Sequence, residues 1–125
     1  MTESKRYSVY LKDVPSVNHM YFNIANRPGV KILTKIGREF KEYSIAVLKK
    51  HVPVINLQGK VIVEAIAHWP DQRRRDMNNY AKIICDSIEE AGIVEDDKMI
   101  LWREMDFVYD KGNQGFELTI YEKEG

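Results

Sequence analysis

The sequence predicts an α+β fold, a four-stranded mixed sheet with two helices on one face, in a single domain that spans residues 1–125. Four segments have the alternation or the β-branched composition of strands, and two segments repeat their apolar residues at helical spacing. The length of 125 residues suits one domain with one core. The apolar and charged fractions, 44% and 30%, are those of a globular protein. The expected element order is β-α-β-α-β-β.

The first expected strand runs from Tyr7 to Leu11. Tyr7, Val9 and Leu11 alternate with Ser8 and Tyr10, which is the period of a half-buried strand. Residues 13–32 are rich in the turn formers Pro, Asn and Gly and predict a long loop. Loops of this length are usually functional or mobile.

The first expected helix follows Thr34, whose side chain suits an N-cap, and runs to about Lys50. Its apolar residues recur at helical spacing, and the basic pair that ends it complements the helix dipole. The stretch from Lys60 to Trp69 is rich in Val and Ile and ends before Pro70. It has the length and composition of an interior strand.

The second expected helix covers residues 77–91, and Gly92 stands where a C-cap glycine belongs. Its apolar stripe consists of Met77, Tyr80, Ala81, Ile84, Cys85, Ile88 and Ala91. A third strand is expected from Met99 to Tyr109 and a fourth from Phe116 to Ile120. Residues 110–113 have turn composition, so we expect the last two strands to form a hairpin.

Bulk composition bounds the function classes. The 19 basic and 19 acidic side chains cancel, so net charge gives no support for nucleic-acid binding. No apolar run approaches the roughly 18 residues of a membrane span. Cys85, the one cysteine, cannot form an internal disulfide and is expected to pack in the core. These features favour a cytoplasmic protein.

The segment between the interior strand and the second helix carries chemistry-bearing residues. Arg73, Arg74 and Arg75 precede Asp76 at the expected helix start, which itself favours anions. Asn78, Lys82 and Asp86 are spaced by four and form a polar helix face. Taken alone, an arginine run is more often a solvated patch, and an acid at a helix start is more often a cap.

Acids also follow the second helix, at Glu95, Asp96 and Asp97. If the strands that flank this helix are parallel, Asp76 and Asp97 lie at opposite ends of the sheet. A straight helix of roughly 15 residues, at about 1.5 Å each, would separate them. A site that uses both acids therefore needs either a bent segment or residues shared across a dimer interface.

An ordered set of motifs resembles the RusA-type Holliday-junction resolvase family. The motifs are Pro70-Asp71, Arg73-Arg74-Arg75-Asp76-Met77-Asn78-Asn79, Lys82, Asp86, Ala91-Gly92 and Asp96-Asp97. The segment Pro15-Ser16-Val17-Asn18-His19-Met20-Tyr21 is similar to an early element of the same family. About thirty residues carry the resemblance.

The resemblance implies a set of site residues. Asp76, Asn78 and Asp97 would fall at the metal-binding positions, and Lys82 at the position of the catalytic lysine. The family uses Mg²⁺, with Mn²⁺ as the alternative ion, and hard divalent cations favour carboxylate oxygens. Arg73, Arg74 and Arg75 would bind DNA phosphates. For Asn18, His19 and Tyr21, which lie in the loop of the early element, two roles stay open: contact with DNA and local turn formation.

Position 78 departs from the family pattern, which has an aspartate there. An amide is a neutral and weaker ligand for Mg²⁺. Three interpretations stay open: an impaired enzyme, compensation by another acid such as Asp71 or Asp96, or an inactivated variant.

The resemblance implies a structure-selective endodeoxyribonuclease that resolves Holliday junctions by paired nicks in opposing strands. Its partners would be four-way branched DNA and a second copy of the chain, since a twofold dimer matches the junction's symmetry. Neither a membrane nor a small-molecule cofactor is expected, and the protein would be cytoplasmic and encoded by a bacterium or a phage. The alternatives are a junction-binding protein that does not cut, because of Asn78, and a module for single-stranded RNA or DNA.

Overall fold

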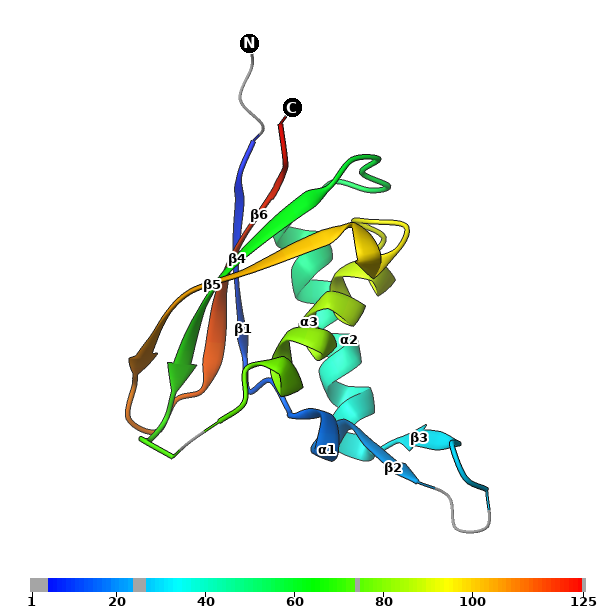
Figure 1. The fold of residues 1–125 in the computed structure, drawn as a ribbon, viewed down its shortest axis with the longest axis vertical. Coiled ribbons are helices and arrows are strands. Elements are labelled where there is room, and N and C mark those ends of the chain that lie inside the picture. Colours follow the sequence, from blue (N-terminus) through cyan, green and yellow to red (C-terminus); the bar gives the residue numbers. More distant parts are fainter. Residues whose placement is uncertain (1–4, 24–26, 74, 125) are drawn as a thin grey trace.

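A computed structural model describes residues 5–23, 27–73 and 75–124. These residues form a four-stranded sheet in the order β1-β6-β4-β5 and a separate two-stranded sheet of β2 and β3. Helices α2 and α3 both lie on one face of the larger sheet (Figure 1). The elements are β1 Tyr7–Lys12, α1 Val17–Met20, β2 Tyr21–Asn23, β3 Lys31–Leu33, α2 Lys35–His51, β4 Val61–Trp69, α3 Asn78–Glu90, the 3₁₀ turn η1 Asp97–Met99, β5 Ile100–Tyr109 and β6 Gly115–Glu122. The predicted α+β fold class is confirmed.

The inner face of β4 is central to the core. Val61, Val63, Ala65, Ala67 and Trp69 alternate toward the helices, and all five are buried. They pack with the inner residues of β6 and with Ile83, Ile84 and Ile88 of α3, which are each at most 1% exposed. Burying this face fixes the rotation of α3, so that its polar residues face away from the sheet.

The predicted hairpin of the last two strands is wrong. β4 lies between β5 and β6, pairing parallel with β5 and antiparallel with β6. The turn after β5 instead crosses the end of β4, where the Asp110 N–H donates to the Trp69 carbonyl at 2.8 Å. The reason is that β4 is an interior strand whose hydrogen-bonding groups need partners on both sides. The crossover through α3 supplies a parallel partner on one side, and β6 fills the other.

A β-bulge interrupts the β4–β5 ladder. Ala65 pairs with Glu104 and Ile66 pairs with Asp106, so Met105 is the extra residue. Past the bulge, Phe107 and Tyr109 pair with Ala67 and Trp69 and therefore share the helix side of the sheet. β5 is an edge strand, and both rings remain about half exposed.

The predicted loop over residues 13–32 is wrong in part, because it contains α1 and the β2–β3 hairpin. The hairpin extends away from the main sheet (Figure 1). The predicted Thr34 cap is confirmed, since its hydroxyl accepts from the Gly37 N–H at 3.0 Å. A Cβ on Gly37 would lie 2.5 Å from the Met20 carbonyl oxygen, so this glycine permits the close approach of α1 and α2.

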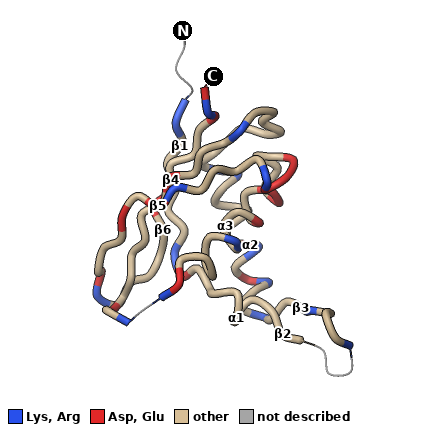
Figure 2. The backbone as a smooth tube through the Cα atoms, in the orientation of Figure 1, with Lys and Arg blue, Asp and Glu red and all other residues tan. Residues whose placement is uncertain are grey.

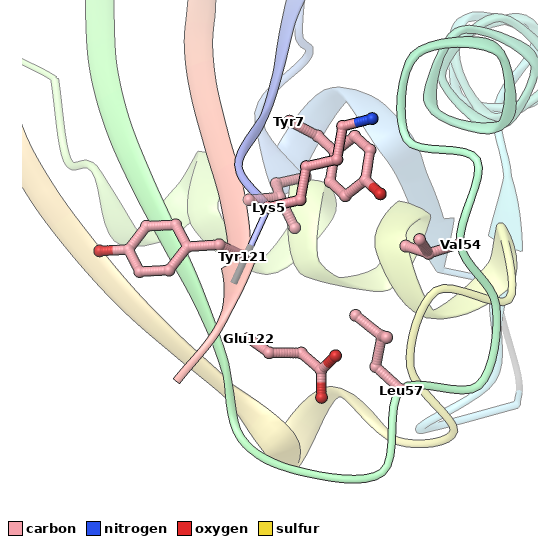
Figure 3. Close-up of a pocket in the computed structure, with 7 residues that line it drawn as sticks. Lys5, Tyr7, Val54, Leu57, Tyr121 and Glu122 are labelled. Carbon is pink, nitrogen blue, oxygen red and sulfur yellow. The ribbon is translucent and has the colours of Figure 1, made fainter. Parts of the chain in front are cut away.

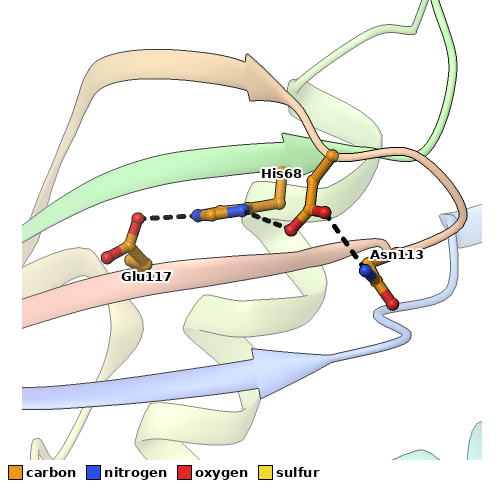
Figure 4. A network of polar contacts seen from close by, with 4 residues as sticks. His68, Asn113 and Glu117 are labelled. Atoms are coloured by element: carbon orange, nitrogen blue, oxygen red, sulfur yellow. Dashed lines mark hydrogen bonds and ion pairs between the residues drawn. The ribbon is translucent and has the colours of Figure 1, made fainter.

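The outer face of the sheet carries a polar cluster around His68 (Figure 4). The His68 Nε2 lies 2.6 Å from Glu117 Oε2, and Nδ1 lies 3.3 Å from Asp110 Oδ2. The hydrogen bond to Glu117 and the second one to Asp110 raise the pKa of His68, although burial opposes them. This cluster ties the end of β4 to β6 and to the turn after β5.

None of the helices in the described part of the chain combines the length and the apolar character that crossing a membrane requires.

Candidate active site

The arginine segment that follows β4 has its own internal support. The Asp71 carboxylate accepts from the Arg73 backbone N–H and from Arg75 Nη1, both at 2.8 Å. The hydrogen bond from Arg75, and then that from the Arg73 backbone, lower the pKa of Asp71 to about 2. Arg75 also donates to the Arg73 carbonyl at 3.0 Å, and its guanidinium lies 5.3 Å from the Trp69 ring centroid. Asp71 and Arg75 thus hold this segment in place.

Arg73 differs from Arg75 in its surroundings. Its side chain is exposed, and within the described residues its guanidinium forms no ion pair. The side chain of Arg75, by contrast, is 10% exposed. Of the two described arginines, Arg73 is therefore the one that can reach a phosphate group. The predicted DNA contact at Arg74 lies outside the described residues.

Asp76 and Asn78 lie together at the start of α3. The Asn78 backbone N–H donates to Asp76 Oδ1 at 3.0 Å, so Asp76 serves the first helical turn in the way a capping residue does. Both side chains are exposed. The capping role uses one carboxylate oxygen, and the exposure of Asp76 leaves its side chain accessible to a cation.

A group of acids lies at the other end of α3 and in the turn that follows it. Glu89, Asp96 and Asp97 each offer a carboxylate oxygen within 4.8 Å of the other two, and all three are partly buried. The Asp97 backbone N–H donates to Glu89 Oε1 at 2.9 Å, which draws the turn onto the helix. Figure 2 shows acidic residues gathered at this turn. Three carboxylates at this spacing are a suitable ligand set for a hard divalent cation.

Asp86 extends the acidic group along α3. Burial, and then the neighbouring Asp97 carboxylate, raise the pKa of Asp86, while Lys82 opposes this shift. Burial and the same acids raise the pKa of Cys85 to about 12, so its thiol stays protonated, in agreement with the expected packing role. Lys98 pairs with Asp96 at 3.9 Å in this region, and a bound divalent cation would further reduce the repulsion among the carboxylates.

The predicted metal ligands do not meet within one chain. β4 and β5 are parallel, so the residues after β4 and those before β5 lie at opposite ends of the pair. Asp76 and Asn78 are at the first end of α3 and Asp97 is beyond the second, and 13 residues at about 1.5 Å each give α3 a length of about 20 Å. Lys82 is exposed on α3, one turn after Asn78 and one turn before Asp86.

Sequence reasoning missed Glu89 and did not assign Asp86 to the site. Asp86 and Glu89 are three residues apart, which places both on the side of α3 that the acidic turn approaches. Asp96 was considered only as a substitute ligand. The i, i+3 spacing of two acids before Gly92, together with the acids just after it, was the available signal.

The two other predicted DNA contacts lie in the early element. Asn18 is exposed on α1, and Tyr21 at the start of β2 is partly buried against the core. α1 contacts both α2 and α3. The two residues are thus placed near the helices rather than on an isolated loop, and of the two only Asn18 is exposed.

A small cavity near the ends of β1 and β6 is distinct in character from these sites (Figure 3). Its lining includes Lys5, Tyr7, Val54, Leu57 and Tyr121, and its volume is about 90 Å³. Ligand pockets usually measure about 300–1,000 Å³. The cavity is too small for a nucleotide.

Comparison with known proteins assigns the family. The family model described as endodeoxyribonuclease RusA matches residues 12–121. The chain is 31% identical over 117 residues to the crossover junction endodeoxyribonuclease RusA of Escherichia coli (strain K12), covering 93% of this chain and 94% of the relative. It is 32% identical to the protein of that name from Shigella sonnei (strain Ss046) and 31% identical to that from Enterobacteria phage 82, with the same coverage. The chain belongs to the RusA family of endodeoxyribonucleases.

Proposed function

We propose that this protein is a structure-selective endodeoxyribonuclease that resolves Holliday junctions by metal-dependent nicks in opposing strands. The observation that carries the proposal is the group of carboxylates formed by Glu89, Asp96 and Asp97, with ligand oxygens within 4.8 Å of one another, on a chain of the RusA family. The related proteins named crossover junction endodeoxyribonucleases support the substrate. We further propose that it acts in the cytoplasm.

The proposed ion is Mg²⁺, with Mn²⁺ as the alternative. Asp97 would bind it together with Glu89 and Asp96, whose hard oxygen ligands suit either ion. A divalent ion of this kind supplies an activated water and stabilises charge on the phosphate oxygens. Glu89, which is not part of the family motif, gives the group a further carboxylate that offsets the charge lost at Asn78.

The remaining residues have distinct proposed roles. Lys82, exposed in the middle of α3, places a positive charge where a phosphate passing along the helix would lie. Arg73 contacts the DNA backbone, while Asp71 and Arg75 hold its loop in position. Asn18 adds a polar contact from α1. Together these residues would position the DNA strand and neutralise the charge of its phosphates.

We propose that the protein works as a homodimer. If Asp76, Asn78 and Asp97 serve one ion, the roughly 20 Å length of α3 means that they come from two copies. A symmetric dimer would then carry two equivalent sites, one for each strand that is cut.

The test is cleavage of a synthetic four-way junction in the presence of Mg²⁺. Paired nicks are expected with the wild type, and Asp97→Asn and Asp76→Asn should remove them, whereas Asn78→Asp should increase the rate. Glu95→Gln is the matched control, because Glu95 is an exposed acid beside the group but is not one of its ligands. Tight junction binding without nicks, before and after Asn78→Asp, would refute the nuclease and favour a binding protein.

A further inference from the structure

A groove lies between the arginine segment and the end of β5. Its volume is about 340 Å³, within the range of about 300–1,000 Å³ that is usual for ligand sites. Its lining comes from the end of β4 and the segment after it, with Trp69, Arg73, Arg75 and Met77, and from β5, with Phe107 and Tyr109. Gln72 and Glu104 add hydrogen-bonding groups to the lining.

The groove presents aromatic surface that is about half exposed. Phe107 is 50% exposed and Tyr109 is 55% exposed, and their ring centroids are 5.9 Å apart at an interplanar angle of 73°. Trp69 is buried below them, in contact with Tyr80 and Phe116. Exposed rings on a rigid strand are the usual platform on which proteins stack unpaired bases.

The charge of the groove suits a nucleotide. Arg75 is held by Asp71, but Arg73 is exposed and, among the residues that the structure describes, has no carboxylate paired with its guanidinium. An arginine beside two open rings provides a contact for a phosphate and a surface for its base.

The groove also adjoins the predicted reaction site. Met77 lines it, and Met77 stands between Asp76 and Asn78, the predicted ligands at the start of α3. A nucleotide whose phosphate lies at this helix start could therefore place its base in the groove while it stays covalently part of the DNA strand.

The apolar residues of β5 do not form one flat patch of the kind that usually joins two protein copies. Val108 pairs with His68 and so faces the outer side of the sheet, opposite to Phe107 and Tyr109. Arg73, Gln72 and Glu104 make the groove itself polar at its rim. These features favour a nucleotide over a second copy of the chain as the occupant.

We propose that this groove holds an unstacked base of the branched DNA, next to the phosphate at the start of α3, with Phe107 and Tyr109 on the base and Arg73 on the phosphate. The inference rests on the proposed function. A branch point supplies bases that are more easily unstacked than those of a duplex, so the groove would contribute to selectivity for junctions.

The experiment uses the full-length chain and four-way junctions that carry 5-iodouracil beside the branch point, in metal-free buffer. Ultraviolet irradiation should link the base to Phe107 or Tyr109, as identified by mass spectrometry. Phe107→Ala and Tyr109→Ala should each lower junction affinity about tenfold, within the range for loss of one base–aromatic contact. Affinity for linear duplex should stay within about twofold.

Met105→Ala is the matched control, because Met105 is 55% exposed on the same strand but does not line the groove. Absence of a cross-link to either ring, or an equal loss of affinity in Met105→Ala, would overturn the inference. Sedimentation of the variants tests the competing occupant, since a loss of dimer in Tyr109→Ala would show that copies of the chain meet there.

If the wild type cuts junctions and these variants bind them normally, the groove inference fails and the proposed function stands. If the wild type neither prefers nor cuts junctions, both fail.

Discussion

Removing one charge from the acidic group should stabilise the metal-free protein. The ligand oxygens of Glu89, Asp96 and Asp97 lie within 4.8 Å of one another. At that separation two like charges repel by about 0.9 kcal/mol in bulk water, and by about 3.5 kcal/mol at an effective dielectric constant of about 20. Asp97→Asn removes two such repulsions, those with Glu89 and Asp96, and in addition the interaction with Asp86, while keeping the side-chain shape. Because the group is only partly buried, we expect each of the two repulsions to contribute near the lower value, so the gain is about 2 kcal/mol or more in total.

The same substitution should remove the stabilisation by Mg²⁺. With an ion at 10 mM and a dissociation constant of about 1 mM, the wild type should gain about 1.4 kcal/mol in the free energy of unfolding. Urea unfolding in EDTA and in Mg²⁺ measures both quantities, for the wild type, Asp97→Asn and the control Glu95→Gln. An Asp97→Asn protein that is no more stable than the wild type in EDTA would refute the repulsion argument. An undiminished response to Mg²⁺ would place the ion elsewhere.

Three other predictions follow from the fold and the arginine segment. The carboxylates of Glu117 and Asp110 raise the pKa of His68, so its ion pairs should stabilise the fold fully below the unfolded pKa of about 6.5. This stabilisation should be lost as pH rises through the higher folded pKa. His68→Gln should abolish the corresponding pH dependence of the free energy of unfolding. Gly37→Ala should cost about 1–3 kcal/mol, because its Cβ would overlap the Met20 carbonyl, whereas Gly59→Ala, with open space around it, should not. Arg73→Ala should weaken DNA binding uniformly and reduce the slope of log affinity against log salt by about 0.9, in a titration from low to moderate salt.

Each of these has a clear contrary outcome. Parallel pH curves for the wild type and His68→Gln would show that the hydrogen bonds to Glu117 and Asp110 contribute no pH-dependent stability. Equal stability of the two glycine variants would mean that α1 can shift away from α2 at little cost. An unchanged salt slope for Arg73→Ala would show that its guanidinium contacts no phosphate.

Local signals in the sequence predicted the main helices and the sheet strands correctly. Thr34 does cap α2, and Gly92 does adopt the left-handed conformation after α3, with φ of +82°. Both features depend on residues close in the chain, so periodicity and capping chemistry suffice to find them.

Strand pairing could not be read in the same way. The turn composition of residues 110–113 is typical of a hairpin, but the partner of β6 is set by the open edge of β4, which belongs to a distant segment. α1 has four residues, too few for a helical period to emerge, and its position depends on contact with α2 and α3.

The site was predictable in part. The motif resemblance named Asp97, which the structure places in one group with Glu89 and Asp96. The parallel arrangement that separates Asp97 from Asp76 was one of the alternatives left open. Glu89 was missed because its relevance comes from the turn after α3, which brings the Asp97 N–H to its carboxylate. Nothing in the spacing of the acids alone fixes that fold-back.

The single extra residue in β5 sets which chemistry each side of the strand displays. In a regular strand, side chains alternate strictly, so Met105 could enter the ladder only if every later residue moved by one position relative to β4. Phe107 and Tyr109 would then turn to the side now occupied by Val108, and Asp106 would turn inward. By keeping Met105 out of the ladder, the bulge prevents this exchange of an aromatic surface for an acidic one. Loss of Met105 would leave both rings on the helix side, because Asp106 would then follow Glu104 directly and keep its pairing with Ile66.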